Sequence, residues 1–240
     1  MKRYRGKDGV EKIWIEPSEL EDMMTHELQK AKLMPMLDNP IVDLEKFVER
    51  HLMVRFDSYA ELDPMVLGQT DFGPDGQIQI LINRDLTGAA LDDDESAPGT
   101  LGRWRATVAH EASHVLLHKS LFIVTKQPSL FEADEGDDPN GLRLQRCLKR
   151  DVTFLTVADW REVQANMGMA ALLMPKHLFI AAVREELARA GIDRIDRGSR
   201  EMTRLVAALA PRFQVSKQAA SIRLDTFQLL SEKGQTSILG

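Results

Sequence analysis

The sequence is short of the residues that mark extracellular and membrane proteins. Cys147 is the one cysteine among 240 residues, so an internal disulfide is excluded and a reducing compartment is favoured. No apolar run approaches the roughly 18 residues that a membrane-spanning helix needs. The opening stretch, MKRYRGKDGVEK, is basic but no apolar core follows it, as a signal peptide would require. We therefore expect a cytoplasmic protein with no membrane association.

An excess of positive charge is also lacking. Lys and Arg number 31 against 37 Asp and Glu, which gives a formal net charge of −6. This balance argues against nucleic-acid binding by the whole surface. The shares of hydrophobic residues, 43%, and charged residues, 28%, are those of a globular protein with a core of its own. The length suits one domain, or one domain with an appendage.

The chain does contain an H-E-x-x-H motif, at His110-Glu111-Ala112-Ser113-His114. Residues four apart share one face of a helix, so both imidazoles can reach one metal ion at about 2.0–2.1 Å. Glu111 is turned about 100° from His110 around the helix axis. Its carboxylate would lie beside the ion, where it can accept a proton from the attacking water. The motif predicts a zinc-peptidase centre with Glu111 as general base.

The flanking sequence predicts that the motif lies on a helix. Leu101, Trp104, Val108, Ala112 and Val115 recur at helical spacing, and Thr100 is suited to cap the start. The alternative is a buried amphipathic helix with incidental histidines, which would bury several polar groups without partners at a cost in free energy.

Two histidines are too few, because a catalytic zinc ion usually has three protein ligands and one open position. His118 lies about 12 Å along the helix from His110, too far to share the ion. The longer motif H-E-x-x-H-x-x-G-x-x-H fails, since Leu117 and Ser120 replace its Gly and His. The third ligand must therefore come from elsewhere in the chain.

Glu162 is the best candidate for the third ligand. It begins a second predicted helix, from Trp160 to Met174, which Pro175 ends. Spacing alone leaves an alternative open, because Asp159-x-x-Glu162 also has the form of a capping box. Asn166 lies on the same face as Glu162 and could orient it.

Strands are predicted before the motif, at Leu52–Phe56, Val66–Phe72 and Gln77–Asn83. The last two flank the turn Gly73-Pro74-Asp75-Gly76 and should pair as a hairpin. Ile78, Ile80 and Ile82 alternate with Gln77, Gln79, Leu81 and Asn83, so one face is apolar, as in a strand packed on helices.

The C-terminal part has the pattern of a helix-turn-helix. Ser216 is suited to cap its second helix, and Arg204, Arg212, Lys217 and Arg223 give it local positive charge. Such a unit is a way of packing helices and is not in itself a sign of DNA binding. We expect residues 191–240 to pack on a peptidase domain formed by residues 1–190, with direct DNA binding disfavoured.

Two segments, VAHEASHVLLH (Val108–His118) and WREVQANMGMAALLMP (Trp160–Pro175), resemble the ImmA/IrrE family of metallo-endopeptidases. Members show H-E-x-x-H-x-x-L-H and then E-x-x-A-N-x-F-A-x-x-L-L-M-P. The first pattern is matched in full. The second is matched at most positions, although Met169 stands near the usual aromatic. The resemblance covers about residues 41–224.

This resemblance implies an α+β, zincin-like fold with a small mixed or antiparallel sheet. It implies that Glu162 is the third metal ligand beside His110 and His114. Asn166 and His118 are our candidates for side chains that orient the ligands. Related zinc peptidases bind an extended substrate along a sheet edge. We assign that edge to the strand that begins Gln77, Ile78, Gln79, Ile80. The alternative is that this segment is simply a strand of the core.

The expected function is that of a zinc-dependent endopeptidase, with Mn²⁺ as a possible ion in the cell. By resemblance, its substrate would be a protein, a helix-turn-helix transcriptional repressor in a stress-response or mobile-element switch. One alternative is a non-catalytic regulator that binds repressor or DNA with an inactive zinc site. Another is the protease half of a toxin–antitoxin-like pair.

Overall fold

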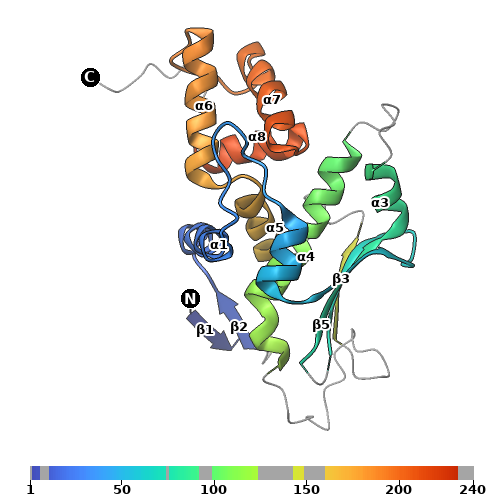
Figure 1. The fold of residues 1–240 in the computed structure, drawn as a ribbon. Helices are drawn as coiled ribbons and strands as arrows, with labels where there is room; N and C mark the ends of the chain where they lie inside the picture. The colour runs from blue at the N-terminus through green and yellow to red at the C-terminus, as the bar shows by residue number, and fades with distance from the viewer. Residues whose placement is uncertain are drawn as a thin grey trace.

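The structure is a computed structural model, and it describes residues 2–5, 11–73, 76–91, 99–123, 143–148 and 160–231. Runs of strands and runs of helices follow one another along these ranges, so the predicted α+β class is confirmed. The sheet lies on one side of the long helix α4 (Thr100–Ile123), and the helices α5 (Trp160–Leu173) and α1 (Pro17–Ala31) lie on the other (Figure 1). The long helix is thus the central layer of the molecule.

The main sheet is mixed, as predicted. Its described strands are β3 (Arg55–Ala60), β4 (Val66–Phe72), β5 (Ile78–Asn83) and β6 (Arg143–Leu148), in the order β3-β5-β4-β6. The predicted hairpin of β4 and β5 is confirmed, and the alternating isoleucines of β5 are buried. The first strand begins later than predicted. Its expected start, Leu52, ends the π-helix η1 (Phe47–Leu52), and Met53 then turns the chain with a φ of 52°.

The prediction that Gln77, Ile78, Gln79 and Ile80 form a substrate-binding edge is wrong. Gln77 precedes β5, and the other three residues lie in it. Strand β5 is internal, because it pairs with β4 on one side and with β3, in parallel, on the other. Its backbone groups on both sides are therefore engaged in the sheet. The sequence signal for the β4–β5 hairpin lies in the turn between these strands. The parallel partner of β5 is β3, which precedes the hairpin and is not indicated by that turn.

The N-terminal region packs against the helical side of α4. Strands β1 (Lys2–Arg5) and β2 (Glu11–Trp14) form a separate antiparallel pair. They lead into α1, which buries Leu20, Met24 and Leu28. The short helix α2 (Leu44–Lys46) begins at Asp43, whose side chain accepts a hydrogen bond from the Lys46 backbone N–H at 3.0 Å. On the sheet side, α3 (Arg84–Leu91) follows β5 directly.

Three helices gather at the far end of the molecule from β1 and β2 (Figure 1). They are α6 (Lys176–Ala190), α7 (Arg200–Phe213) and α8 (Lys217–Thr226). The Ser216 side chain caps α8 as predicted, accepting from the Ala219 N–H at 3.0 Å. The proposed boundary after residue 190 coincides with the end of α6, and the division into two units stays a prediction.

In the described ranges, no helix alone has the length and apolar character to cross a membrane. The two helices α5 and α6 meet such a criterion only as a pair, and they are bent by 56° relative to each other.

Candidate metal centre

The H-E-x-x-H motif lies in the middle of α4, where the helix crosses between the sheet and α5. His110, Glu111 and His114 are almost completely buried, with 1% exposure or less. The predicted helix is confirmed and begins at Thr100. Four of its five predicted apolar positions, Trp104, Val108, Ala112 and Val115, are buried, and they fix which way the motif faces. The fifth, Leu101, is wrong as a buried position: it lies in the first turn of the helix and is 39% exposed.

Glu162 meets the two histidines from the first turn of α5. Its Oε2 lies 3.1 Å from His110 Nε2, and its Oε1 lies 3.3 Å from His114 Nε2. The two Nε2 atoms are 3.0 Å apart. Ligands of a tetrahedral zinc ion bound at 2.0–2.1 Å lie about 3.3 Å from one another, so this triangle has the dimensions of a metal site. His110, His114 and Glu162 form a group that could hold a metal ion.

The position of α5 depends on a close approach between small residues of the two helices. A Cβ on Gly168 would lie 2.7 Å from Ser113 Oγ and 2.9 Å from Ser113 Cβ. These separations are shorter than atoms tolerate without a shift. Glycine at this position therefore lets α5 come near enough to α4 for Glu162 to reach both histidines.

Burial and the contacts within the triangle shift the pKa values of its three side chains. Burial alone would raise the pKa of Glu162, but its hydrogen bonds with His110 and His114 lower it well below its ordinary value. Burial would lower the pKa of His110, and the hydrogen bond with Glu162 and the nearby carboxylates raise it instead. Burial lowers the pKa of His114, and the charge of His110 adds to this effect. An ionised carboxylate faces two imidazole nitrogens, which is a donor set suited to a divalent cation.

Two predicted orienting residues contact the outer nitrogens of the histidines. Asn166 Oδ1 lies 3.1 Å from His110 Nδ1, so it can accept that N–H and leave Nε2 free for a metal. His118 Nδ1 lies 3.0 Å from His114 Nδ1. Burial lowers the pKa of His118 to about 3, with a further contribution from His114. His118 is therefore a neutral partner of His114, not a third ligand.

The Glu111 carboxylate lies between the triangle and the sheet. Its Oε2 accepts a hydrogen bond of 2.6 Å from Thr70 Oγ1 on β4, while its Oε1 has no hydrogen-bond partner within the described ranges. Burial raises the pKa of Glu111 to about 8, although His110 and Thr70 act in the opposite direction. Strand β4 comes this close because residue 68 is glycine: a Cβ there would lie 2.6 Å from Thr107 Cγ2 and 3.0 Å from Glu111 Oε1.

The sequence interpretation missed several residues of this site, namely Gly68, Thr70, Gly168 and Gln164. Gly168 and Gln164 lie within the segment Trp160–Pro175, but they follow Glu162 by six and two residues, so helical spacing does not place them on the face of Glu162. Nothing local distinguishes Gly68 and Thr70 from other residues of a strand. The capping-box alternative involved Asp159, which lies outside the described residues, while Glu162 faces the histidines.

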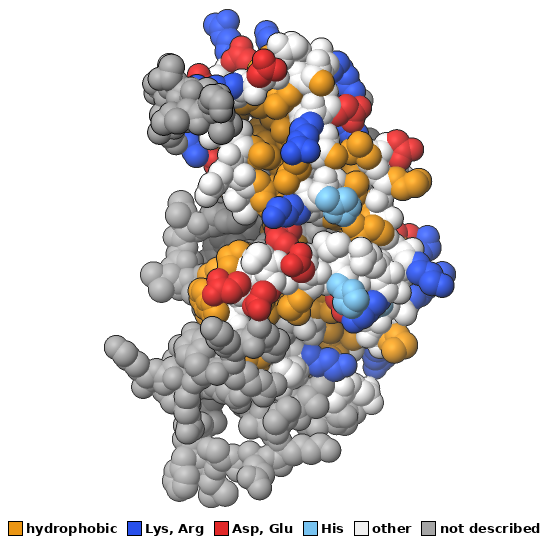
Figure 2. All heavy atoms as spheres, turned by 90° about the vertical axis from the view of Figure 1, so that its left-hand side faces the viewer, with side chains coloured by type: hydrophobic (Ala, Val, Ile, Leu, Met, Phe, Trp, Pro, Cys, Tyr) orange, Lys and Arg blue, Asp and Glu red, His pale blue; other side chains and the backbone are white. Residues whose placement is uncertain are grey.

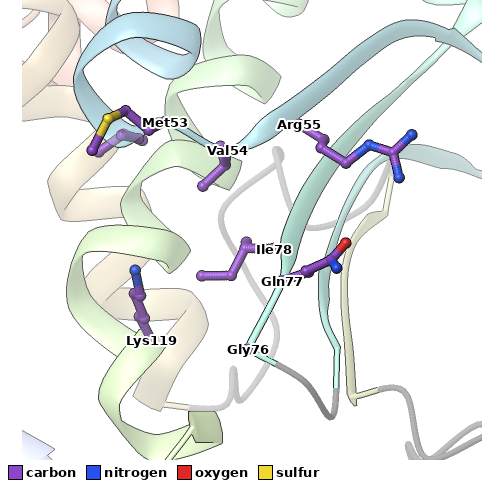
Figure 3. A pocket seen from close by; sticks show the side chains of 8 residues that line it. Met53, Val54, Arg55, Gly76, Gln77, Ile78 and Lys119 are labelled. Atoms are coloured by element: carbon purple, nitrogen blue, oxygen red, sulfur yellow. The ribbon is translucent and has the colours of Figure 1, made fainter.

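The residues assigned to the substrate edge contribute to a different feature. Gln77 and Ile78 line a pocket together with Met53 and Arg55 and with Lys119 from the last turns of α4 (Figure 3). None of the metal-ligand candidates is among the residues that line it. The structure thus separates these residues from the His110–His114–Glu162 triangle.

Comparison with protein families places this geometry in a known context. Residues 99–225 match the model of the IrrE N-terminal-like domain, Peptidase_M78. The chain belongs to this family. The predicted ImmA/IrrE membership is confirmed, and so is the metallopeptidase type of the protein. The Peptidase_M78 match includes the α4 motif, Glu162 and both helices of the C-terminal pair α7 and α8. None of the curated proteins searched matches the chain.

Proposed function

We propose that this chain is a zinc-dependent endopeptidase that hydrolyses a peptide bond in a protein substrate. The observation that carries the proposal is the triangle of His110, His114 and Glu162 with the Glu111 carboxylate beside it. The separations of 3.0 to 3.3 Å within the triangle fit one small cation. The two Nε2 atoms and a carboxylate favour zinc among the common cellular ions, with Mn²⁺ as the alternative.

A metal ion held by His110, His114 and Glu162 would supply a Lewis acid that polarises the scissile carbonyl and makes water a stronger acid. The protein's own part in the reaction is assigned to Glu111. Its Oε2 is held by Thr70, so the carboxylate has a fixed orientation, and Oε1 is left as the acceptor for the water proton. The same oxygen then returns that proton to the leaving amine. Asn166 and His118 keep the two imidazoles in place during these transfers.

An extended substrate segment would pair with β6 in this proposal. Among the described strands, β6 pairs on one side only, with β4, and so presents a free edge. In that pair, Gln145 of β6 lies opposite Thr70, which contacts Glu111. The other outer strand, β3, is separated from β4 by β5. The β6 edge is therefore the one nearer to the proposed base.

The C-terminal pair α7 and α8 is assigned a packing and docking role, not DNA recognition. Arg223 is 2% exposed, and its guanidinium binds Glu21 at 2.8 Å and the Met174 carbonyl at 2.6 Å. Arg212 donates to Glu185 at 2.8 Å and to the Leu37 carbonyl at 2.7 Å. Both guanidinium groups are therefore paired with partners within the chain. Figure 2 shows the face on the side of α1 and α6, where basic and acidic side chains are interspersed.

The substrate we propose is a helix-turn-helix transcriptional repressor, whose cleavage would switch on stress-response or mobile-element genes. This assignment rests on family resemblance and on the free edge of β6, which suits an extended segment of a protein substrate. Of the alternatives, a regulator with an inactive site would not require the buried Glu111 carboxylate beside the three candidate metal ligands. A toxin–antitoxin-like pair would use the same chemistry on a different partner.

The test is a cleavage assay with the zinc-loaded protein and a small repressor encoded next to its gene. The wild type should cut the repressor at one or a few bonds, and Glu111→Gln should slow cleavage by about 10²–10⁴-fold. If neither protein cuts it and both have the same regulatory effect in cells, the non-catalytic reading is correct. Growth arrest that depends on Glu111 and is relieved by the partner would instead indicate a toxin–antitoxin pair.

A further inference from the structure

Gln164 is a buried polar residue beside the metal centre that the proposed reaction does not use. It follows Glu162 by two residues on α5 and is 5% exposed. Its Nε2 donates a hydrogen bond of 2.8 Å to the backbone carbonyl of Ile13 in β2, and its Oε1 lies 3.3 Å from His118 Nε2. The residue thus joins the N-terminal strand pair to the histidines of α4.

These contacts fix the direction of every hydrogen bond up to the metal ligand. Only the nitrogen of an amide can donate to the Ile13 carbonyl, so the Gln164 oxygen must accept, and His118 Nε2 must carry a hydrogen. A neutral imidazole carries one hydrogen, so His118 Nδ1 is an acceptor and takes the Nδ1–H of His114, 3.0 Å away. His114 Nε2 is then left with a free lone pair. This nitrogen is the one that faces Glu162 and His110.

We propose that Gln164 is a positioning residue that holds His114 in its metal-binding tautomer through His118, and that the Ile13 carbonyl makes strand β2 a functional part of the metal centre. The proposal rests on the metal site proposed above. Without the Ile13 carbonyl, the Gln164 amide could turn over and present its nitrogen to His118. His118 would then have to accept at Nε2, and its Nδ1–H would face the Nδ1 of His114, which favours the wrong tautomer for binding at Nε2.

The surroundings of this chain of hydrogen bonds exclude competing partners. His118 has essentially no exposure and Ile13 has 1%. The Trp160 ring stands nearly perpendicular to the His118 ring, with centroids 5.5 Å apart. Since water has little access, the partners that the protein supplies decide each tautomer. A purely structural role, in which Gln164 only fastens β2 to α5, would leave the metal affinity unaffected once the fold is intact.

Metal affinity and stability of the full-length protein separate these two roles. Gln164→Met keeps the length of the side chain and removes both hydrogen bonds. Its Zn²⁺ dissociation constant should rise by about 10–100-fold, as for other residues that orient a ligand. The matched control is Asn83→Leu, which removes a buried amide bonded to the Val66 carbonyl at 2.9 Å, away from the metal centre. It should lower the stability of the metal-free protein while leaving the dissociation constant within about twofold of wild type. An unchanged dissociation constant in Gln164→Met would overturn the proposal.

A double-mutant cycle tests whether Gln164 acts through His118. In a His118→Phe background, Gln164→Met should have no further effect on Zn²⁺ affinity, because the intermediate link is already lost. Additive losses in the two variants would contradict the proposed route.

The wild-type protein provides a test that does not depend on how the variants fold. Long-range ¹H–¹⁵N spectra of histidine-labelled, zinc-loaded protein should show His114 protonated at Nδ1 and His118 protonated at Nε2. His118 protonated at Nδ1 would overturn the assignment. If the wild type binds no metal, the proposed function fails. If the wild type binds metal but the observed tautomers, or the Zn²⁺ affinity of Gln164→Met, differ from those expected, only this inference fails.

Discussion

Gly168 on α5 lies against Ser113 on α4 with no room for a side chain between them, since a Cβ at residue 168 would approach Ser113 Oγ to 2.7 Å. Ser113 Oγ cannot easily move away, because it donates to the Ala109 carbonyl at 2.7 Å. This contact sets the distance between the helix that holds both histidines and the helix that holds Glu162. The metal site therefore depends on a residue that has no polar side chain.

Gly168→Ala should separate the two helices and weaken the site. We expect a loss of about 1–3 kcal/mol in the free energy of unfolding, typical of overpacking. The Zn²⁺ dissociation constant, measured by competition with a chelator, should rise by about tenfold because Glu162 is displaced. Adding Ser113→Gly makes room for the new methyl group and should restore metal affinity, although glycine in a helix costs about 1 kcal/mol of stability. Unchanged affinity in Gly168→Ala would show that the spacing does not depend on this contact.

Thr70→Val should impair cleavage without releasing metal. Thr70 donates at 2.6 Å to Glu111, and a hydrogen bond to a charged group contributes about 1.5–3 kcal/mol. Losing it should slow cleavage by about tenfold or more, while the metal content stays at the wild-type level. Thr107→Val is the matched control, since the Thr107 hydroxyl is buried but bonds to the Arg103 carbonyl of its own helix. Equal cleavage rates in the two variants would show that the Thr70 hydrogen bond to Glu111 does not contribute to cleavage.

The metal-free protein should become less stable relative to Glu111→Gln as the pH rises from about 5 to 8. Burial raises the pKa of Glu111 to about 8 from an ordinary value of 4.5. Between these values the folded chain keeps a proton that the unfolded chain has lost, so folding is increasingly penalised as the pH rises. Urea unfolding of both proteins with chelator present, at several pH values, measures the difference. A difference that is constant with pH would mean that Glu111 ionises in the metal-free fold as it does in the unfolded chain.

Arg223→Met should lower stability sharply. It would leave Glu21 without its cation and the Met174 carbonyl without its donors, and removing one partner of a buried pair costs about 3–5 kcal/mol. Arg212→Met, at a more exposed pair with Glu185, should cost less than Arg223→Met in the same denaturant titration. Equal and small losses of stability in the two variants would show that the Arg223 contacts do not hold α8 on the peptidase core.

Neither the wild type nor an Arg212/Lys217 double neutralisation should show sequence-specific duplex binding at physiological salt.

How far the sequence predicted the site depends on how local each contact is. His110, Glu111 and His114 followed from the geometry of one helix turn, and the structure places them as that geometry requires. The approach of Glu162 is a contact between two helices, and Glu162 follows His110 by 52 residues in the chain. Spacing alone left it open against a capping box, and family resemblance selected it.

The errors in the predicted fold also come from contacts that are distant in sequence. The β4–β5 hairpin was predicted correctly because four adjacent turn-forming residues indicate it in the sequence. The parallel pairing of β5 with β3 has no such local signal, so the strand from Gln77 to Ile80 was wrongly placed at an edge. Thr70 and Gln164 were missed for the same reason, because each becomes functional only through a partner on another element.

The central claim is that His110, His114 and Glu162 bind one metal ion while Glu111 stands beside it without binding. The metal-to-protein ratio of purified, full-length variants tests it most directly. The account predicts about one ion per chain, most often zinc, in the wild type and in Glu111→Gln, and a large loss in Glu162→Ala, with all three proteins folded. Full occupancy in Glu162→Ala, or loss of the ion in Glu111→Gln, would contradict it.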